Sequence, residues 1–154
     1  MYALHLAITA MRNGDCDSAI VAACNCIMDP STQLMMTKLG VLSPTSTCHT
    51  FDSAADGYAR GEAFSALYLK KMSDAVEGEY PIRAFVRGTA INANGRTGGI
   101  THPSREGQEA VIRQAYQNAQ LPLYDTAYFE CHGTGTPVSW SYPFSHSSSL
   151  VSED

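Results

Sequence analysis

Residues 126–137, TAYFECHGTGTP, hold the stretch that decides the fold. The aromatic-rich run at residues 126–131 predicts a β-strand, and His132 opens the loop that follows it. This loop contains two glycines and two threonines within five residues. Layered α/β proteins commonly place their sites in such loops, so we expect the His132 imidazole at the carboxyl edge of a sheet, as a catalytic or binding group. A histidine that only occupies a turn is the alternative that these residues leave open.

Helices and strands alternate upstream of His132. The helix predicted at residues 105–118 has Ser104 as its N-terminal cap, and its Glu109 lies four residues before Arg113, the spacing of a stabilising pair. The continuous apolar run SAIVAAC at residues 18–24 predicts a strand buried on both faces. Further helices are predicted at residues 1–13, 30–39 and 72–76, further strands at residues 62–70 and 81–93, and a loop at residues 43–53. This alternation indicates a layered α/β fold.

The composition excludes several classes of protein. A chain of 154 residues that is 44% hydrophobic is long enough for one packed domain, while its net charge of −5 leaves no broad basic surface for nucleic acid or an anionic membrane. No apolar run approaches the roughly 20 residues that span a bilayer, and the first twelve residues contain no basic leader with a cleavage site. We therefore expect a soluble, cytoplasmic protein. Its first helix has no capping residue before it, which predicts that the chain is cut from something longer.

The five cysteines are odd in number and lack the regular spacing of a secreted disulfide framework, so we expect free thiols. A zinc site can be drawn from Cys24, Cys26, Cys48 and His49. A single residue between the first two cysteines fits the usual spacing of zinc ligands poorly, however, and buried or edge thiols are the simpler interpretation. We predict no metal site.

Several long motifs in the right order resemble the β-ketoacyl synthases of the thiolase-like fold. HGTGTP after a predicted strand is similar to the first histidine motif of that family. The resemblance extends over residues 1–138 and is closest to fungal iterative polyketide synthases of the highly reducing type. Its other motifs are DPSTQLMMTKLGVLSPT at residues 29–45, FDSAADGYARGEAF at residues 51–64 and INANGRTGGITHPSREGQEAVIRQAY at residues 91–116. The resemblance implies a partial thiolase-like layered fold, made of the end of the first repeat and much of the second.

The resemblance also implies a reaction, the decarboxylative Claisen condensation. In the family a cysteine thiolate holds the growing acyl chain as a thioester, and a malonyl unit arrives on the phosphopantetheine arm of an acyl carrier protein. Two histidines stabilise the oxyanion that develops as carbon dioxide leaves. By this resemblance His132 is the first of the two histidines, while Thr134 and Thr136 line the pantetheine tunnel. No cofactor is expected to bind directly, and the family implies a dimer.

Two groups that this chemistry needs do not occur in the chain. The family carries its nucleophile in a DTACSSS-type segment just before the helix that begins here at Tyr2, and none of the five cysteines has that context. After Val138 the family continues toward a lysine and the second histidine, whereas residues 139–154 are serine-rich and predicted to be disordered; His146 in that tail lacks the motif's context. We expect no turnover by the isolated chain beyond weak malonyl decarboxylation. The alternatives are a non-catalytic module that binds acyl carrier protein or a complete synthase, and a truncated gene model.

Other polar residues have simpler interpretations. His5 lies near the apolar stripe of the first helix and is expected to pack rather than to act in catalysis. His49 and His102 fall in polar loops, where exposure to solvent is expected. Asp56 and Arg60, in the segment ADGYARG, are predicted to form an ion pair that orders their loop rather than to handle substrate.

Overall fold

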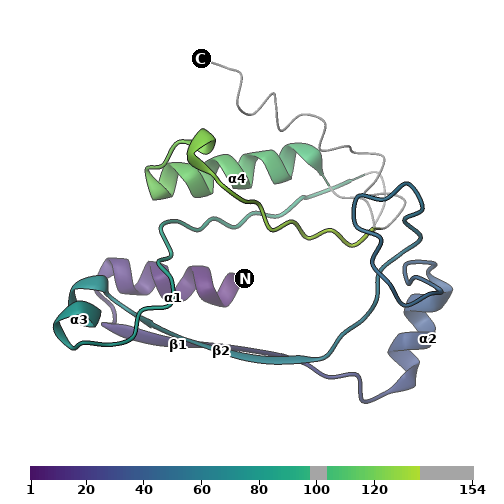
Figure 1. The fold of residues 1–154 in the computed structure, drawn as a ribbon, viewed down its shortest axis with the longest axis horizontal. Helices are drawn as coiled ribbons and strands as arrows, with labels where there is room; N and C mark the ends of the chain where they lie inside the picture. Colours follow the sequence, from purple (N-terminus) through teal and green to yellow (C-terminus); the bar gives the residue numbers. More distant parts are fainter. Residues whose placement is uncertain (98–103, 136–154) are drawn as a thin grey trace.

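The computed structural model describes residues 1–97 and 104–135 of the chain (Figure 1). The predictions on His102, Thr136, Val138, His146 and the serine-rich tail at residues 139–154 lie outside these described residues. The elements within them are α1 (Tyr2–Asn13), β1 (Ser18–Asn25), α2 (Pro30–Lys38), β2 (Ala63–Lys70), α3 (Met72–Glu77), α4 (Arg105–Ala119) and the 3-10 turn η1 (Leu123–Asp125).

Strands β1 and β2 form an antiparallel two-stranded sheet whose register runs from the Ser18–Lys70 pair to the Asn25–Ala63 pair. Both strands were predicted, but burial of the first on both faces is wrong. Ile20 is 75% exposed and Phe64 on the partner strand is 77% exposed. In the described part of the chain no third strand joins the sheet, and the helix that packs on β1 is α1. Apolar composition predicted the strand correctly, whereas burial depends on layers that cover both faces of the sheet.

The predicted helices are confirmed, with their signals at the expected ends. Helix α1 ends at Gly14, which has a left-handed backbone with φ of 83°, and α3 ends at Gly78. Helix α4 is capped as predicted, because the Ser104 hydroxyl oxygen accepts a hydrogen bond of 3.0 Å from the Gly107 N–H. The Arg113 guanidinium and the Glu109 carboxylate form the predicted pair at 3.0 Å. Local sequence is sufficient here because caps and neighbouring turns involve residues only a few positions apart.

The strands predicted at residues 81–93 and 126–131 are absent from the described chain, since neither segment forms a ladder of hydrogen bonds with a neighbouring strand. Alternating side chains favour an extended chain, but a strand also needs an adjacent partner to complete its hydrogen bonds. Figure 1 shows the first of these segments running between α1 and α4 instead. The correction matters for the site, because it removes the sheet edge at which His132 was expected.

Side chains of α1 and α4 hold residues 81–93 between the two helices. From α1, the Arg12 guanidinium donates to the Arg87 carbonyl oxygen at 2.8 Å and the Tyr2 hydroxyl donates to the Asn92 carbonyl oxygen at 3.0 Å. From α4, the Asn118 amide donates to the Thr89 carbonyl oxygen at 2.9 Å. These bonds satisfy backbone carbonyl groups of the segment, as the hydrogen bonds of a sheet do in a paired strand.

We call the contact between α1 and residues 87–92 the joint, and His5 belongs to it. It is half-buried on α1, and its Nδ1 atom lies 2.9 Å from the Thr89 hydroxyl oxygen. This contact fits the predicted packing role. Gly88 brings the segment close to α4, because a Cβ atom at this position would lie 2.4 Å from the Ala115 carbonyl oxygen and 2.7 Å from the Ala119 nitrogen. The joint therefore combines hydrogen bonds with a backbone approach that only glycine permits.

The helices within residues 1–97 and 104–135 are all too short or too polar to cross a membrane.

Candidate functional site

His132 lies on an exposed stretch of chain rather than at a sheet edge. The segment before it pairs with no strand, so the predicted placement at the rim of a sheet is wrong for the described residues. Its imidazole makes no hydrogen bond with any of the residues that the structure describes. The contacts that the structure shows for this motif are those of the backbone after the histidine.

The backbone after His132 is bound to a loop far away in sequence. The Thr50 hydroxyl donates a hydrogen bond of 2.6 Å to the Gly133 carbonyl oxygen, and the Gly57 N–H donates one of 3.1 Å to the Gly135 carbonyl oxygen. Gly133 and Gly135 have φ values of 52° and 64°, in the left-handed region that favours glycine. We call residues 132–135 the histidine loop and residues 49–57 the cradle loop, since the second holds the first at these two points.

Glycines also let the two loops approach closely. A Cβ atom on Gly133 would lie 2.5 Å from the Thr50 methyl carbon, and one on Gly135 would lie 3.2 Å from the His49 carbonyl oxygen. Gly135 is buried as a result. In this structure the two glycines therefore allow the backbone of the motif to pack closely against the cradle loop. This is in addition to the expected approach of that backbone to a ligand.

The cradle loop is itself closely tied. The Asp52 N–H donates to the His49 carbonyl oxygen at 3.2 Å, and the Ala54 N–H donates to the Asp52 carboxylate at 2.8 Å. Phe51 has a φ of 61°, unusual for a residue with a bulky side chain and costly unless the surroundings hold it. Beyond the loop, Tyr58 forms a parallel bridge with Leu42. The cradle loop thus has a defined conformation that is held by its own hydrogen bonds.

Two predictions on this loop need correction. His49 is half-buried, and its Nε2 atom lies 3.4 Å from the Thr45 hydroxyl oxygen, so simple exposure to solvent is wrong. The predicted ion pair between Asp56 and Arg60 is also wrong, because the Arg60 guanidinium donates instead to the Gln33 side-chain oxygen at 3.2 Å. The Asp56 Oδ1 atom is buried without a hydrogen-bond partner among the described residues.

The structure places the other predicted residues less specifically. Thr134 is half-buried between the two glycines, and Thr136 lies outside the described residues. Upstream of the histidine, the Tyr128 hydroxyl donates to the Glu130 carboxylate, and this bond raises the pKa of the Tyr128 phenol. All five cysteines are free thiols.

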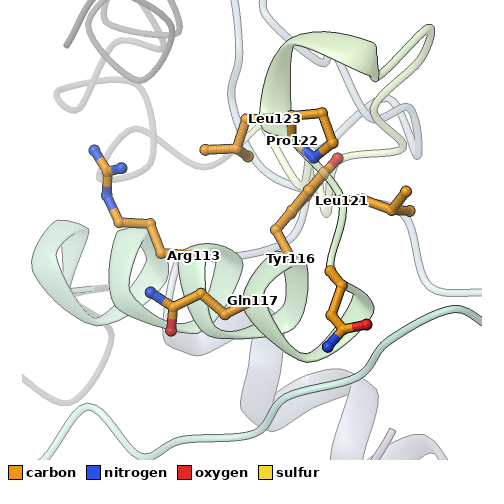
Figure 2. A pocket seen from close by; sticks show the side chains of 7 residues that line it. Arg113, Tyr116, Gln117, Leu121, Pro122 and Leu123 are labelled. Carbon is orange, nitrogen blue, oxygen red and sulfur yellow. The ribbon is translucent and has the colours of Figure 1, made fainter. Parts of the chain in front are cut away.

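Two shallow hollows lie elsewhere on the molecule. Figure 2 shows one of about 410 Å³ where α4 meets the turn after it; Tyr116, Gln117 and Leu123 are among its lining residues. In that hollow Arg113 is already engaged by Glu109, and no second charged group accompanies it. The other, of about 470 Å³, lies against β1 and β2 and includes Cys24 and Phe64. Neither is lined by His132 or Thr134, so the tunnel predicted around those residues stays a prediction.

Sequence reasoning found His132 but missed Thr50 and the cradle loop. Thr50 and Gly133 are separated by 83 positions, and no periodicity in the sequence connects residues so far apart. The available signal is the family motif FDSAADGYARGEAF, which begins at the residue after Thr50 and includes most of the cradle loop.

Comparisons with known proteins match almost the whole chain. The family described as "Beta-ketoacyl synthase, N-terminal domain" matches residues 1–75, and "Beta-ketoacyl synthase, C-terminal domain" matches residues 83–139. Prosolanapyrone synthase of Alternaria solani is 82% identical over 139 residues, which are 90% of this chain and 5% of that protein. A highly reducing polyketide synthase of Pyrenophora dematioidea is 62% identical over 138 residues, again 90% of this chain and 5% of that protein.

Solved structures agree with the sequence matches. The oxazolomycin ketosynthase domain KS7 of Streptomyces albus has a TM-score of 0.86 at 37% identity, covering 90% of this chain and 24% of the other. The ketosynthase from module 6 of the bacillaene synthase of Bacillus subtilis has a TM-score of 0.90 at 33% identity, covering 96% of this chain and 27% of the other. The predicted fold class, part of a thiolase-like layered α/β fold, is therefore confirmed. The chain belongs to the β-ketoacyl synthase family and corresponds to part of a polyketide synthase ketosynthase, and the relatives that it matches include fungal highly reducing polyketide synthases.

Proposed function

We propose that this chain supplies the first catalytic histidine of a ketosynthase that performs decarboxylative Claisen condensation. His132 donates a hydrogen bond from its ring N–H to the thioester oxygen of a malonyl unit as carbon dioxide leaves and negative charge develops on that oxygen. The enolate then attacks an acyl thioester, forming the new carbon–carbon bond and releasing the cysteine thiolate. The observation that carries the proposal is the HGTG segment at residues 132–135. It lies inside residues 83–139, which match the C-terminal domain of the β-ketoacyl synthase family.

The geometry of the loop supports this role. A general feature of oxyanion stabilisation is a donor held in place before charge develops, so that no reorganisation is needed during the reaction. The imidazole makes no hydrogen bond with a described residue, and the backbone that follows it is fixed at Gly133 and Gly135. A ring that is free to donate and attached to a fixed backbone suits this task.

The substrates proposed are thioesters carried on the phosphopantetheine arm of an acyl carrier protein, with Thr134 and Thr136 lining the tunnel for that arm. The nucleophilic cysteine and the second histidine belong to motifs that this chain does not contain. Condensation therefore needs both groups from the remainder of a synthase, and a ketosynthase dimer is the form in which we expect it. The 154-residue chain alone is expected to complete no acyl transfer.

A hybrid synthase tests the proposal. In it, residues 1–138 of this chain replace the matching stretch of prosolanapyrone synthase of Alternaria solani, which is 82% identical. We expect the hybrid to form product and to release carbon dioxide from a malonyl-loaded carrier protein. His132→Ala should lower the rate of carbon dioxide release by about 100- to 1,000-fold, the usual loss when one oxyanion donor is removed.

His5→Ala is the matched control, because that histidine binds Thr89 in the joint with α1. It should leave decarboxylation within about threefold of the hybrid if the protein stays folded, as judged by unchanged elution on size-exclusion chromatography. Equal rates for the hybrid and its His132→Ala variant would refute the proposal. An alternative function, a non-catalytic module that binds carrier protein, predicts binding of the carrier by the 154-residue chain with no dependence on His132.

A further inference from the structure

We infer that Thr50 is a positioning residue for His132, acting through the adjacent residue Gly133, whose carbonyl oxygen it binds. This inference rests on the proposed function, since it concerns how the proposed oxyanion donor is kept in place. It adds a residue, and a loop, to which the sequence motifs give no such role.

The first step is that the ring of His132 has no side-chain support. Catalytic histidines are commonly oriented by a hydrogen bond to the second ring nitrogen. No described residue makes such a bond with His132. Among the described residues, the support for His132 comes from the hydrogen bonds to the backbone that follows it.

The second step is that Thr50 holds that backbone with two different groups. Its hydroxyl donates to the Gly133 carbonyl oxygen at 2.6 Å. Its methyl group fills the space beside the Gly133 α-carbon, where an added Cβ atom would come within 2.5 Å of the methyl carbon. The hydroxyl fixes the direction of the Gly133–Thr134 peptide, and the methyl group lies against Gly133.

The third step is that the cradle loop is rigid enough to transmit this restraint. Phe51, the next residue, is held at a φ of 61°, and the Asp52 N–H closes a turn back to the His49 carbonyl oxygen. A second bond, from the Gly57 N–H to the Gly135 carbonyl oxygen, prevents the histidine loop from pivoting about Thr50 alone. Figure 1 shows the yellow-green end of the described chain meeting the dark blue loop region that follows α2.

Two substitutions separate the hydroxyl from the methyl. Thr50→Val keeps the branched shape and removes the donor, whereas Thr50→Ser keeps the donor and removes the methyl. Thr47→Val is the matched control, because the Thr47 hydroxyl is also exposed and donates to a backbone oxygen, that of Thr45, but makes no hydrogen bond with a described residue of the histidine loop.

In the hybrid synthase, Thr50→Val should lower kcat for carbon dioxide release by about 10-fold with KM unchanged, since misplacing a catalytic group affects mainly the transition state. Thr50→Ser and Thr47→Val should stay within about threefold of the hybrid. If Thr50 only stabilised the fold, its substitution would lower the amount of active protein. It would not lower kcat in Thr50→Val while leaving kcat intact in Thr50→Ser.

Nuclear magnetic resonance of the 154-residue chain gives a readout that does not depend on activity. The order parameter of the Gly133 amide should fall from about 0.85 to below about 0.6 in Thr50→Val and stay high in Thr50→Ser. The inference is overturned if Thr50→Val leaves both kcat and the order parameter unchanged, or if Thr50→Ser is as impaired as Thr50→Val. Should His132→Ala keep full activity, the proposed function fails; should His132→Ala lose activity while Thr50→Val keeps it, only this inference fails.

Discussion

Replacing Gly57 by alanine should destabilise the chain by about 2–6 kcal/mol, through two separable effects. Gly57 has a φ of 137°, a conformation in which a residue with a side chain is strained by about 1–3 kcal/mol. The added Cβ atom would also lie 2.5 Å from the Ser43 nitrogen and 2.6 Å from the Leu42 carbonyl carbon. These are backbone atoms that cannot rotate away, so overpacking adds about 1–3 kcal/mol.

Two other glycines separate strain from overpacking. Gly40 has a φ of 67°, but an added Cβ atom would meet nothing within 4 Å, so Gly40→Ala should cost only the strain of about 1–2 kcal/mol. Gly61 has an ordinary φ and open space around it, and Gly61→Ala should change stability by less than about 0.5 kcal/mol.

Urea unfolding of the 154-residue chain at low micromolar concentration, followed by circular dichroism, measures the three losses. With a urea dependence of about 2 kcal/mol per molar, Gly57→Ala should lower the midpoint by about 1–3 M. A loss no larger than that of Gly40→Ala would refute the reasoning, because it would mean that the close approach between Gly57 and the backbone at residues 41–43 contributes nothing.

Three further predictions follow from other parts of the molecule. Ile20 and Phe64 are about three-quarters exposed on neighbouring strands, so the chain should bind the dye ANS and elute from size-exclusion chromatography at a concentration-dependent volume, and the double variant Ile20→Thr, Phe64→Ser should weaken both effects; a dye-free monomer at every concentration would contradict this. Removing the cap of α4 with Ser104→Ala should lower the free energy of unfolding by about 1 kcal/mol in the same urea assay, whereas Ser73→Ala, whose hydroxyl bonds the neighbouring Asp74 side chain, should have little effect. The hydrogen bond to Asp17 raises the pKa of Lys71, so this pair stabilises the fold fully below the ordinary pKa of lysine and less as pH rises through the raised value. The difference in urea midpoint between the chain and Lys71→Met should therefore shrink as pH rises over that range. A difference that grows with pH would contradict this prediction.

The fold was predictable where the signals are local. The Ser104 cap, the Glu109–Arg113 spacing and the Gly14 stop each depend on residues within one or two turns, and each is found in the structure. The strands predicted at residues 81–93 and 126–131 were wrong because alternation reports a tendency of the chain, whereas pairing depends on a neighbour that local sequence does not identify.

The site was predictable only in part, for a similar reason. His132 stands out because its loop combines a histidine with glycines and threonines, and the motif identified the family. Thr50 lies in a stretch rich in serine and threonine that correctly predicted a loop, yet nothing local distinguishes its hydroxyl from that of Thr47. Their difference arises from which residue the folded chain brings alongside, and this depends on long-range contacts.

The joint between α1 and residues 87–92 has a consequence for recombination. One family description covers α1 and the other covers these residues, so the joint connects the two halves of the match. The donors Arg12 and Tyr2 are side chains, whereas the acceptors at Arg87 and Asn92 are main-chain carbonyls. Since every amino acid brings a carbonyl, the second half can diverge at these positions without losing an acceptor, while the first half must keep its donors. Chimeras that exchange the second half should thus tolerate distant parents better than chimeras that exchange α1.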